Sequence, residues 1–137
     1  MILVDNRSGE ELPIMEYEAL AAFVLEQSET KPSTTELSIS LVGLSEMHDL
    51  NRDYRGKDAP TDVLAFENDG DLLGDVVICP PIAREHALEF DSSFEDEMAL
   101  MLTHGILHLL GHTHEGDTEA KVMEARENEL LELWRTK

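Results

Sequence analysis

Four of the chain's six histidines lie within eleven residues, in the stretch from His104 to His114. Apolar residues fill most of the gaps between them. Imidazole rings in an apolar run are poorly solvated, so they need bonding partners. A metal ion can satisfy several rings at once, and this stretch therefore predicts a mononuclear zinc site around which the local fold is built.

The spacing of these histidines predicts a helix that must turn. His104 and His108 are four residues apart, so a helix places them on one face about one turn apart, where they can share an ion. In a straight helix, His112 would lie about 12 Å along the axis from His104, which is too far for a common ion. Gly111 permits a turn because glycine adopts left-handed conformations without a Cβ penalty. Beyond that turn, His112 or His114 can return toward the ion.

The full pattern His104-x3-His108-x2-Gly111-x2-His114 has the spacing of the three-histidine metzincin site. We therefore predict that His104, His108 and His114 bind one zinc ion per chain. Three protein ligands leave a position for water, which is the catalytic arrangement. His112 is the alternative ligand and is otherwise interpreted as a neighbour of the site or a solvent-facing residue. The competing interpretation is that all of these are core or surface histidines without a metal.

The residue after the first histidine is Gly105. Zinc proteases with this pattern carry a glutamate at that position, where it acts as the general base. Peptide hydrolysis by the usual zincin route is therefore disfavoured. A zinc ion can still lower the pKa of bound water to about 7 or polarise a phosphoryl oxygen.

The hydrophobic pattern predicts four strands and five helices in the order β-α-β-α-β-β-α-α-α. The strands are expected at 2–4, 37–41, 62–66 and 72–79, and the helices at 14–27, 45–54, 80–89, 93–110 and 117–134. The third and fourth strands are expected to pair as an antiparallel hairpin through Asn68, Asp69 and Gly70. The helix at 93–110 is apolar nearly all round and is expected to be buried. The pattern predicts a single α+β domain over residues 1–137, with a small mixed four-stranded sheet packed with helices.

Some residues receive expectations from local sequence alone. The expected helix caps are Ser45, Ser92 or Ser93, and Asp117 or Thr118. The acidic residues Glu124, Glu127, Glu129 and Glu132 are interpreted as the solvated side of the last helix. His48 and His86 are isolated in the sequence, and no functional role is expected for them.

The chain is strongly acidic, with 30 aspartates and glutamates against 10 lysines and arginines. A net charge of −20 argues against broad attraction to nucleic acid or to anionic membranes. The only cysteine is Cys79, which excludes an internal disulfide and favours a reducing compartment. There is no signal-peptide pattern and no apolar run of about 20 residues, so a cytoplasmic protein without a membrane partner is expected.

Arg52, Arg55 and Lys57 place three cations within six positions of this acidic chain. Arg55 can bind a phosphate through its planar set of donors, and Lys57 offers a point charge. We predict that all three residues bind an anionic substrate. The alternative is an ordinary solvated loop.

The motif His-Gly-x-Leu-His-Leu-x-Gly-x-x-His at 104–114 resembles the signature of the YbeY family. Three further blocks, at 50–64, 73–76 and 123–127, resemble the same family, so the similarity covers nearly the whole chain. The resemblance implies a zincin-like domain whose buried helix carries the metal-binding histidines. It also implies a zinc-dependent single-strand endoribonuclease that acts in maturation of the 16S ribosomal RNA 3′ end and in ribosome quality control.

Residue by residue, the resemblance implies that His104, His108 and His114 bind zinc and that Arg55 is the required catalytic arginine beside the metal. The implied partners are single-stranded ribosomal RNA, the small ribosomal subunit with its proteins, and an assembly GTPase. Thr113 departs from the family pattern, which has aspartate before the last histidine, and this change can alter how His114 is oriented.

The mechanistic hypothesis is phosphodiester hydrolysis, with Arg55 stabilising the charge that develops on phosphorus. Two alternatives stay open at this point. One is a non-catalytic ribosome assembly factor that contains zinc, and the other is a zinc hydrolase of peptides or small molecules.

Overall fold

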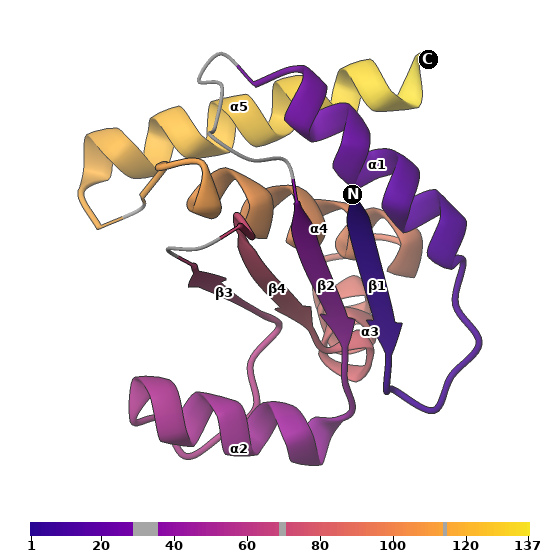
Figure 1. Ribbon diagram of the computed structural model, residues 1–137, viewed down its shortest axis with the longest axis vertical. Coiled ribbons are helices and arrows are strands. Elements are labelled where there is room, and N and C mark those ends of the chain that lie inside the picture. The colour runs from indigo at the N-terminus through magenta and orange to yellow at the C-terminus, as the bar shows by residue number, and fades with distance from the viewer. Residues whose placement is uncertain (29–35, 69–70, 114) are drawn as a thin grey trace.

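The computed structural model describes residues 1–28, 36–68, 71–113 and 115–137. These residues form four strands and five helices in the predicted order (Figure 1). The strands are β1 (Ile2–Asn6), β2 (Leu37–Leu41), β3 (Val63–Glu67) and β4 (Gly74–Ile78). The helices are α1 (Ile14–Glu26), α2 (Leu44–Arg55), α3 (Pro80–Glu89), α4 (Phe94–Leu109) and α5 (Asp117–Arg135).

The four strands make one mixed sheet in the order β1-β2-β4-β3. β2 pairs in parallel with β1 on one side and with β4 on the other, whereas β3 runs antiparallel to β4, with Val63 opposite Ile78 and Glu67 opposite Gly74. The predicted pairing of the third and fourth strands is therefore confirmed. The turn expected between them includes Asp69 and Gly70, which lie outside the described residues.

The two faces of the sheet bury different helices because successive side chains of a strand point to opposite faces. Val76 and Ile78 of β4 belong to the main core with α1, α4 and α5, whereas Val77 packs with Met47 of α2 in a smaller core. Figure 1 shows α2 standing apart from α1, α4 and α5. Arg55, the last residue of α2, therefore belongs to a different packing layer from His104 and His108 on α4.

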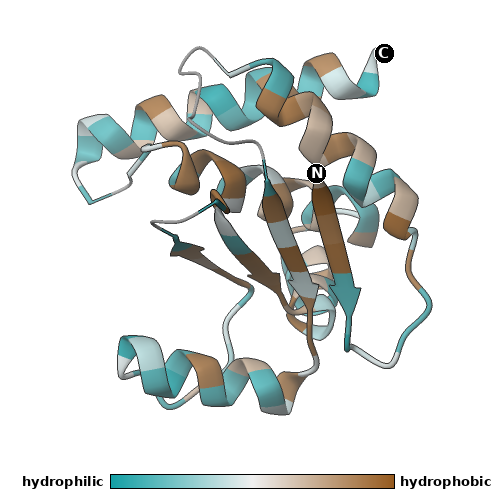
Figure 2. Cartoon of the chain, in the orientation of Figure 1, coloured by the Kyte–Doolittle hydropathy of each residue, from teal (hydrophilic) through white to brown (hydrophobic). Residues whose placement is uncertain are grey.

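Helix α4 is the buried helix that the sequence predicts. Met98, Leu102 and Ile106 are at most 1% exposed and face the main core. Figure 2 shows hydrophobic residues along α4 and the strands, and a more hydrophilic α5. Complete burial of one such side chain stabilises the fold by about 1.5–3 kcal/mol relative to its exposure.

Gly105 explains how closely α4 approaches the sheet. A Cβ atom at this position would lie 2.6 Å from Cγ1 of Val76 on β4, inside the contact distance of two carbon atoms. The glycine is therefore a packing requirement of the histidine helix. The same close approach leaves no room for the glutamate that zinc proteases carry after the first histidine.

The helix ends agree only in part with the sequence. Ser93 caps α4 as predicted, its hydroxyl accepting a 3.0 Å hydrogen bond from the backbone N–H of Asp96. The other two cap predictions are wrong, because α2 and α5 follow Gly43 and Gly116 and have no side-chain cap. Both glycines are extended, a conformation suited to the N-cap position, where glycine is tolerated.

No helix within the described ranges is both long enough and apolar enough to cross a membrane.

Candidate functional site

The turn that the histidine spacing requires is present after α4. Gly111 has a φ of +104°, in the left-handed region. Its N–H donates to the carbonyl of His108 at 3.1 Å, and the N–H of His112 donates to the carbonyl of Leu107 at 3.0 Å. These two bonds form a Schellman motif with glycine at its usual position. The prediction that the chain turns at Gly111 is confirmed.

His104 and His108 line the same pocket, which has a volume of about 420 Å³. We name it the His108 pocket. Its walls come from α4, from the end of α2, from β3 and from the turn after α4. The described lining residues are Tyr54, Arg55, Val63, Leu64, Ala65, Phe66, His104, Gly105, His108, Thr113 and Glu115.

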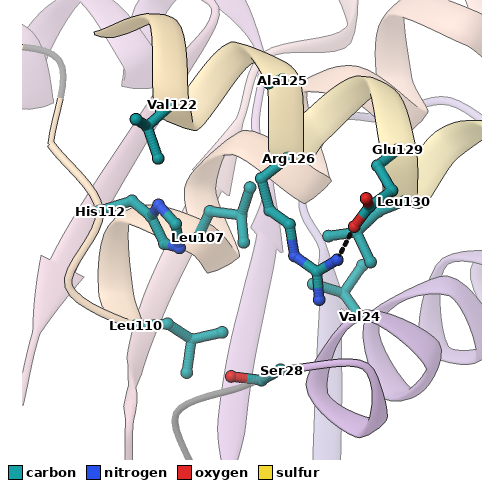
Figure 3. A pocket seen from close by; sticks show the side chains of 10 residues that line it. All are labelled: Val24, Ser28, Leu107, Leu110, His112, Val122, Ala125, Arg126, Glu129 and Leu130. Carbon is teal, nitrogen blue, oxygen red and sulfur yellow. Dashed lines mark hydrogen bonds and ion pairs between the residues drawn. The ribbon is translucent and has the colours of Figure 1, made fainter. Parts of the chain in front are cut away.

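His112 lies elsewhere, in a pocket between the end of α4, α1 and α5. Figure 3 shows its ring near Leu107 and Val122, with Arg126 on the far side paired to Glu129. The Schellman turn thus separates His112 from the pocket of His104 and His108. His114 falls outside the described residues, so the predicted three-histidine set stays a prediction. Among the residues that are described, no three histidine, cysteine or acidic side chains are placed to hold a metal.

His104 is held by a buried carboxylate that the sequence interpretation missed. Its Nδ1 hydrogen-bonds to Oε1 of Glu127 on α5. This bond raises the pKa of His104 above its usual value, and burial opposes the rise. In the neutral ring, Nδ1–H donates to Glu127, which makes Nε2 the ring nitrogen that would ligate a metal. Histidine ligands commonly have such a carboxylate partner, so this donor set fits zinc.

The solvated role expected for Glu127 is wrong, because this residue is only 7% exposed. The acidic residues around it on the same helix, Glu124, Glu129 and Glu132, are exposed as expected. Met123, Glu127 and Leu130 follow one another at helical spacing and are all buried. That spacing places Glu127 on the apolar stripe of α5, and it is the sequence signal that could have identified the residue.

A second pocket, of about 550 Å³, adjoins the first. We name it the Glu97 pocket. It shares Arg55, Val63 and His104 with the His108 pocket. Its other described lining residues are Asp62, His86, Phe90, Glu97, Leu100, Met101 and Glu127.

His86, for which no role was expected, faces this second pocket. Its Nδ1 lies 3.7 Å from Oδ2 of Asp62, whose other oxygen accepts a 2.7 Å hydrogen bond from the backbone N–H of Val63. Its ring makes an edge contact with Phe90, the centroids being 5.7 Å apart. His86 comes from α3, a separate helix, and no spacing in the sequence connects it with His104.

The three predicted substrate-binding cations are placed differently. Arg55, the last residue of α2, lines both pockets and is their only lysine or arginine among the described residues. Arg52 forms exposed ion pairs with Asp49 and Asp53 at 3.3 and 3.1 Å. Neither Arg52 nor Lys57 lines either pocket. The structure brings Arg55, but not the other two cations, to His104.

The α+β fold places two histidines and an arginine around one pocket, which is a set of side chains typical of an enzyme active site. The model of the family described as "Endoribonuclease YbeY" matches residues 3–135. The chain belongs to this family, as the resemblance implied.

Individual relatives agree with this assignment. The endoribonuclease YbeY of Geobacillus thermodenitrificans is 43% identical over 117 residues, which is 75% of each chain. That of Legionella pneumophila (strain Corby) is 40% identical over 136 residues, covering 93% of this chain and 85% of the relative. The solution structure of a protein from Thermotoga maritima superposes with a TM-score of 0.61 at 27% identity, covering 99% of this chain and 93% of that one. The α+β fold class is confirmed.

Proposed function

We propose that this protein is a zinc-dependent endoribonuclease that cleaves single-stranded ribosomal RNA in the cytoplasm. The family name of its relatives supports the reaction, and the meeting of Arg55 and His104 at two adjoining pockets supports the position of the site. Its role would be maturation of the 16S ribosomal RNA 3′ end and ribosome quality control. The observation that carries the proposal is that Arg55, the only arginine or lysine among the described residues that line these two pockets, adjoins a histidine already oriented by a buried glutamate.

The proposed metal ligands are His104, His108 and His114 in a zincin-like site. One zinc ion bound there would supply Lewis-acid chemistry and lower the pKa of bound water. Glu127 accepts the hydrogen bond from Nδ1 of His104 and thereby fixes the ring tautomer and orientation. Arg55 binds the substrate phosphate and stabilises the negative charge that builds on its oxygens.

Hydrolysis of peptides is the weaker alternative. The glutamate that serves as general base in zinc proteases is replaced by Gly105, and a Cβ there would lie 2.6 Å from Val76. Assays on RNA and on casein, with and without chelator, separate the two activities. Cleavage of casein alone would overturn the proposal.

The test of the proposal joins metal analysis to RNA cleavage. Purified protein should contain about one zinc per chain, and a chelator should abolish cleavage reversibly. In Arg55→Ala, zinc content and melting temperature should persist while cleavage falls by orders of magnitude. Arg52→Ala is the matched control, because Arg52 comes from the same helix but pairs with aspartates outside the pockets. Unchanged cleavage by Arg55→Ala would remove this residue from the mechanism.

The net charge of −20 favours a second, compatible role as a ribosome assembly factor. An acidic surface suits contact with the basic proteins of the small ribosomal subunit, and an assembly GTPase is a further proposed partner. If the folded protein cleaved no RNA and His114→Ala abolished folding, zinc would be structural and this role would stand alone.

A further inference from the structure

The Glu97 pocket contains a carboxylate that the proposed chemistry does not use. Glu97 lies on α4 and is only 7% exposed. Within the described part of the chain, no group donates a hydrogen bond to its carboxylate. The carboxylate lines the pocket and its oxygens are not among the fully buried atoms of the described chain, so a ligand in the pocket that brings its own N–H groups can donate to it.

The position of Glu97 relative to His104 sets the size of that ligand. The two residues are seven apart on one helix, so they lie on the same face about 10.5 Å apart along the axis. This separation keeps Glu97 away from a phosphate at His104. It suits contact with the base of the neighbouring nucleotide.

The other acidic groups of the Glu97 pocket already have partners. Glu127 accepts from His104, and Asp62 accepts from the backbone of Val63 and lies beside His86. Together with Glu97 they set three carboxylates against the single arginine of this pocket, Arg55, so beside Glu97 a neutral group is favoured over a second phosphate. A neutral base can enter, and Glu97 remains to accept a hydrogen bond from it.

The rim of the Glu97 pocket offers a surface for stacking. Phe90 is 63% exposed, and the edge contact with His86 supports its ring on one side. Bases of single-stranded RNA stack on such aromatic rings, with about 1–3 kcal/mol per base lost on alanine substitution. The pocket therefore combines an aromatic ring with an acceptor for the base edge, as in other proteins that read single-stranded RNA.

We propose that the Glu97 pocket binds a nucleobase adjacent to the scissile phosphate and that Glu97 selects bases carrying an amino group. Cytosine, adenine and guanine each present amino N–H donors to a carboxylate. Uracil has no amino group, and its single N3–H donor lies between two carbonyl oxygens that face the carboxylate unfavourably. The inference rests on the proposed ribonuclease function, and it makes Glu97 a specificity-determining residue and Phe90 a stacking residue.

The test uses short single-stranded oligoribonucleotides that differ only in the nucleotides flanking one cleavage site. The wild type should cleave substrates with an amino-bearing base on one side of the cut about fivefold to a hundredfold faster, as kcat/KM, than the uracil substrate. Glu97→Gln should reduce this discrimination, because its amide can donate to the uracil carbonyl. Glu95→Gln, at an exposed position of the same helix, is the control and should keep the wild-type preference.

Phe90 gives an independent test of the stacking surface. Phe90→Ala should raise KM about fivefold to a hundredfold, and Phe90→Trp should restore it, with an unchanged melting temperature in both variants. RNA cleavage with equal rates for uracil and cytosine at both flanking positions would overturn the inference and leave the proposed function standing. Absence of RNA cleavage by the zinc-loaded wild type would overturn both.

Discussion

The two pockets that meet at His104 have walls of different chemistry. Besides His104, the His108 pocket is lined by His108 of α4 and by the turn that follows α4. The Glu97 pocket is lined instead by carboxylates and by the exposed ring of Phe90. Arg55 belongs to both. In the proposed function, the His108 pocket holds the metal and the Glu97 pocket receives a base. Variants on the two sides should therefore change different measured quantities.

The largest expected effect is that of His108→Ala. Loss of one proposed zinc ligand should remove most of the bound zinc and lower RNA cleavage by orders of magnitude, as metal analysis and cleavage assays would measure. Glu97→Gln should keep its zinc, which separates the two pockets. His112→Ala is the matched control, since this histidine faces a different pocket. Loss of zinc in His112→Ala would return that residue to the ligand set.

The histidine stretch shows which parts of the site could be predicted from the sequence. The i,i+4 spacing and the need for a turn at Gly111 are local geometry, and the Schellman motif agrees with them. The order of elements and the burial of α4 likewise follow from hydrophobic periodicity. The position of His114 relative to the other two histidines is not among the described residues, so the ligand set is still inferred from spacing and family.

The residues that the sequence interpretation missed are those whose role depends on tertiary packing. Glu97, Glu127 and His86 come from three different helices, and each enters the pockets only because those helices pack on the sheet. An acidic residue on a helix is usually solvated, so burial of a carboxylate is invisible without its neighbours. Arg52 and Arg55 likewise share one helix and one residue type, yet only Arg55 reaches the pockets.

The next effect in size is that of Glu127→Gln. This change keeps the shape of the side chain but removes the negative charge that faces Nδ1 of His104. Loss of such a partner typically lowers metal affinity by about 10–100-fold. Competition with a chelator of known affinity would measure it. Glu124→Gln, on the exposed side of the same helix, should leave affinity unchanged, and equal effects of the two substitutions would contradict a specific role for Glu127.

Both pockets depend on the distance between α4 and the sheet, which Gly105 sets. In Gly105→Ala the new methyl group would meet Val76 at 2.6 Å, and overpacking of this kind typically costs about 1–3 kcal/mol of unfolding free energy. Denaturant unfolding would measure that loss. Val76→Ala removes the clashing atoms, so the double variant should be more stable than the sum of the two single changes predicts. Strict additivity would show that the contact does not limit the approach of α4.

The smallest expected effect concerns Thr113, which lines the His108 pocket and stands where the family pattern has aspartate. Its hydroxyl accepts a 3.2 Å hydrogen bond from the backbone N–H of Glu115. A carboxylate can accept the same bond, so Thr113→Asp should keep the turn and the zinc affinity close to those of the wild type. Thr113→Ala removes the acceptor and should cost about 0.5–1.5 kcal/mol of unfolding free energy, with base preference unchanged. A change of base preference in Thr113→Ala would mean that the two pockets are coupled, because this residue faces only the side proposed to hold the metal.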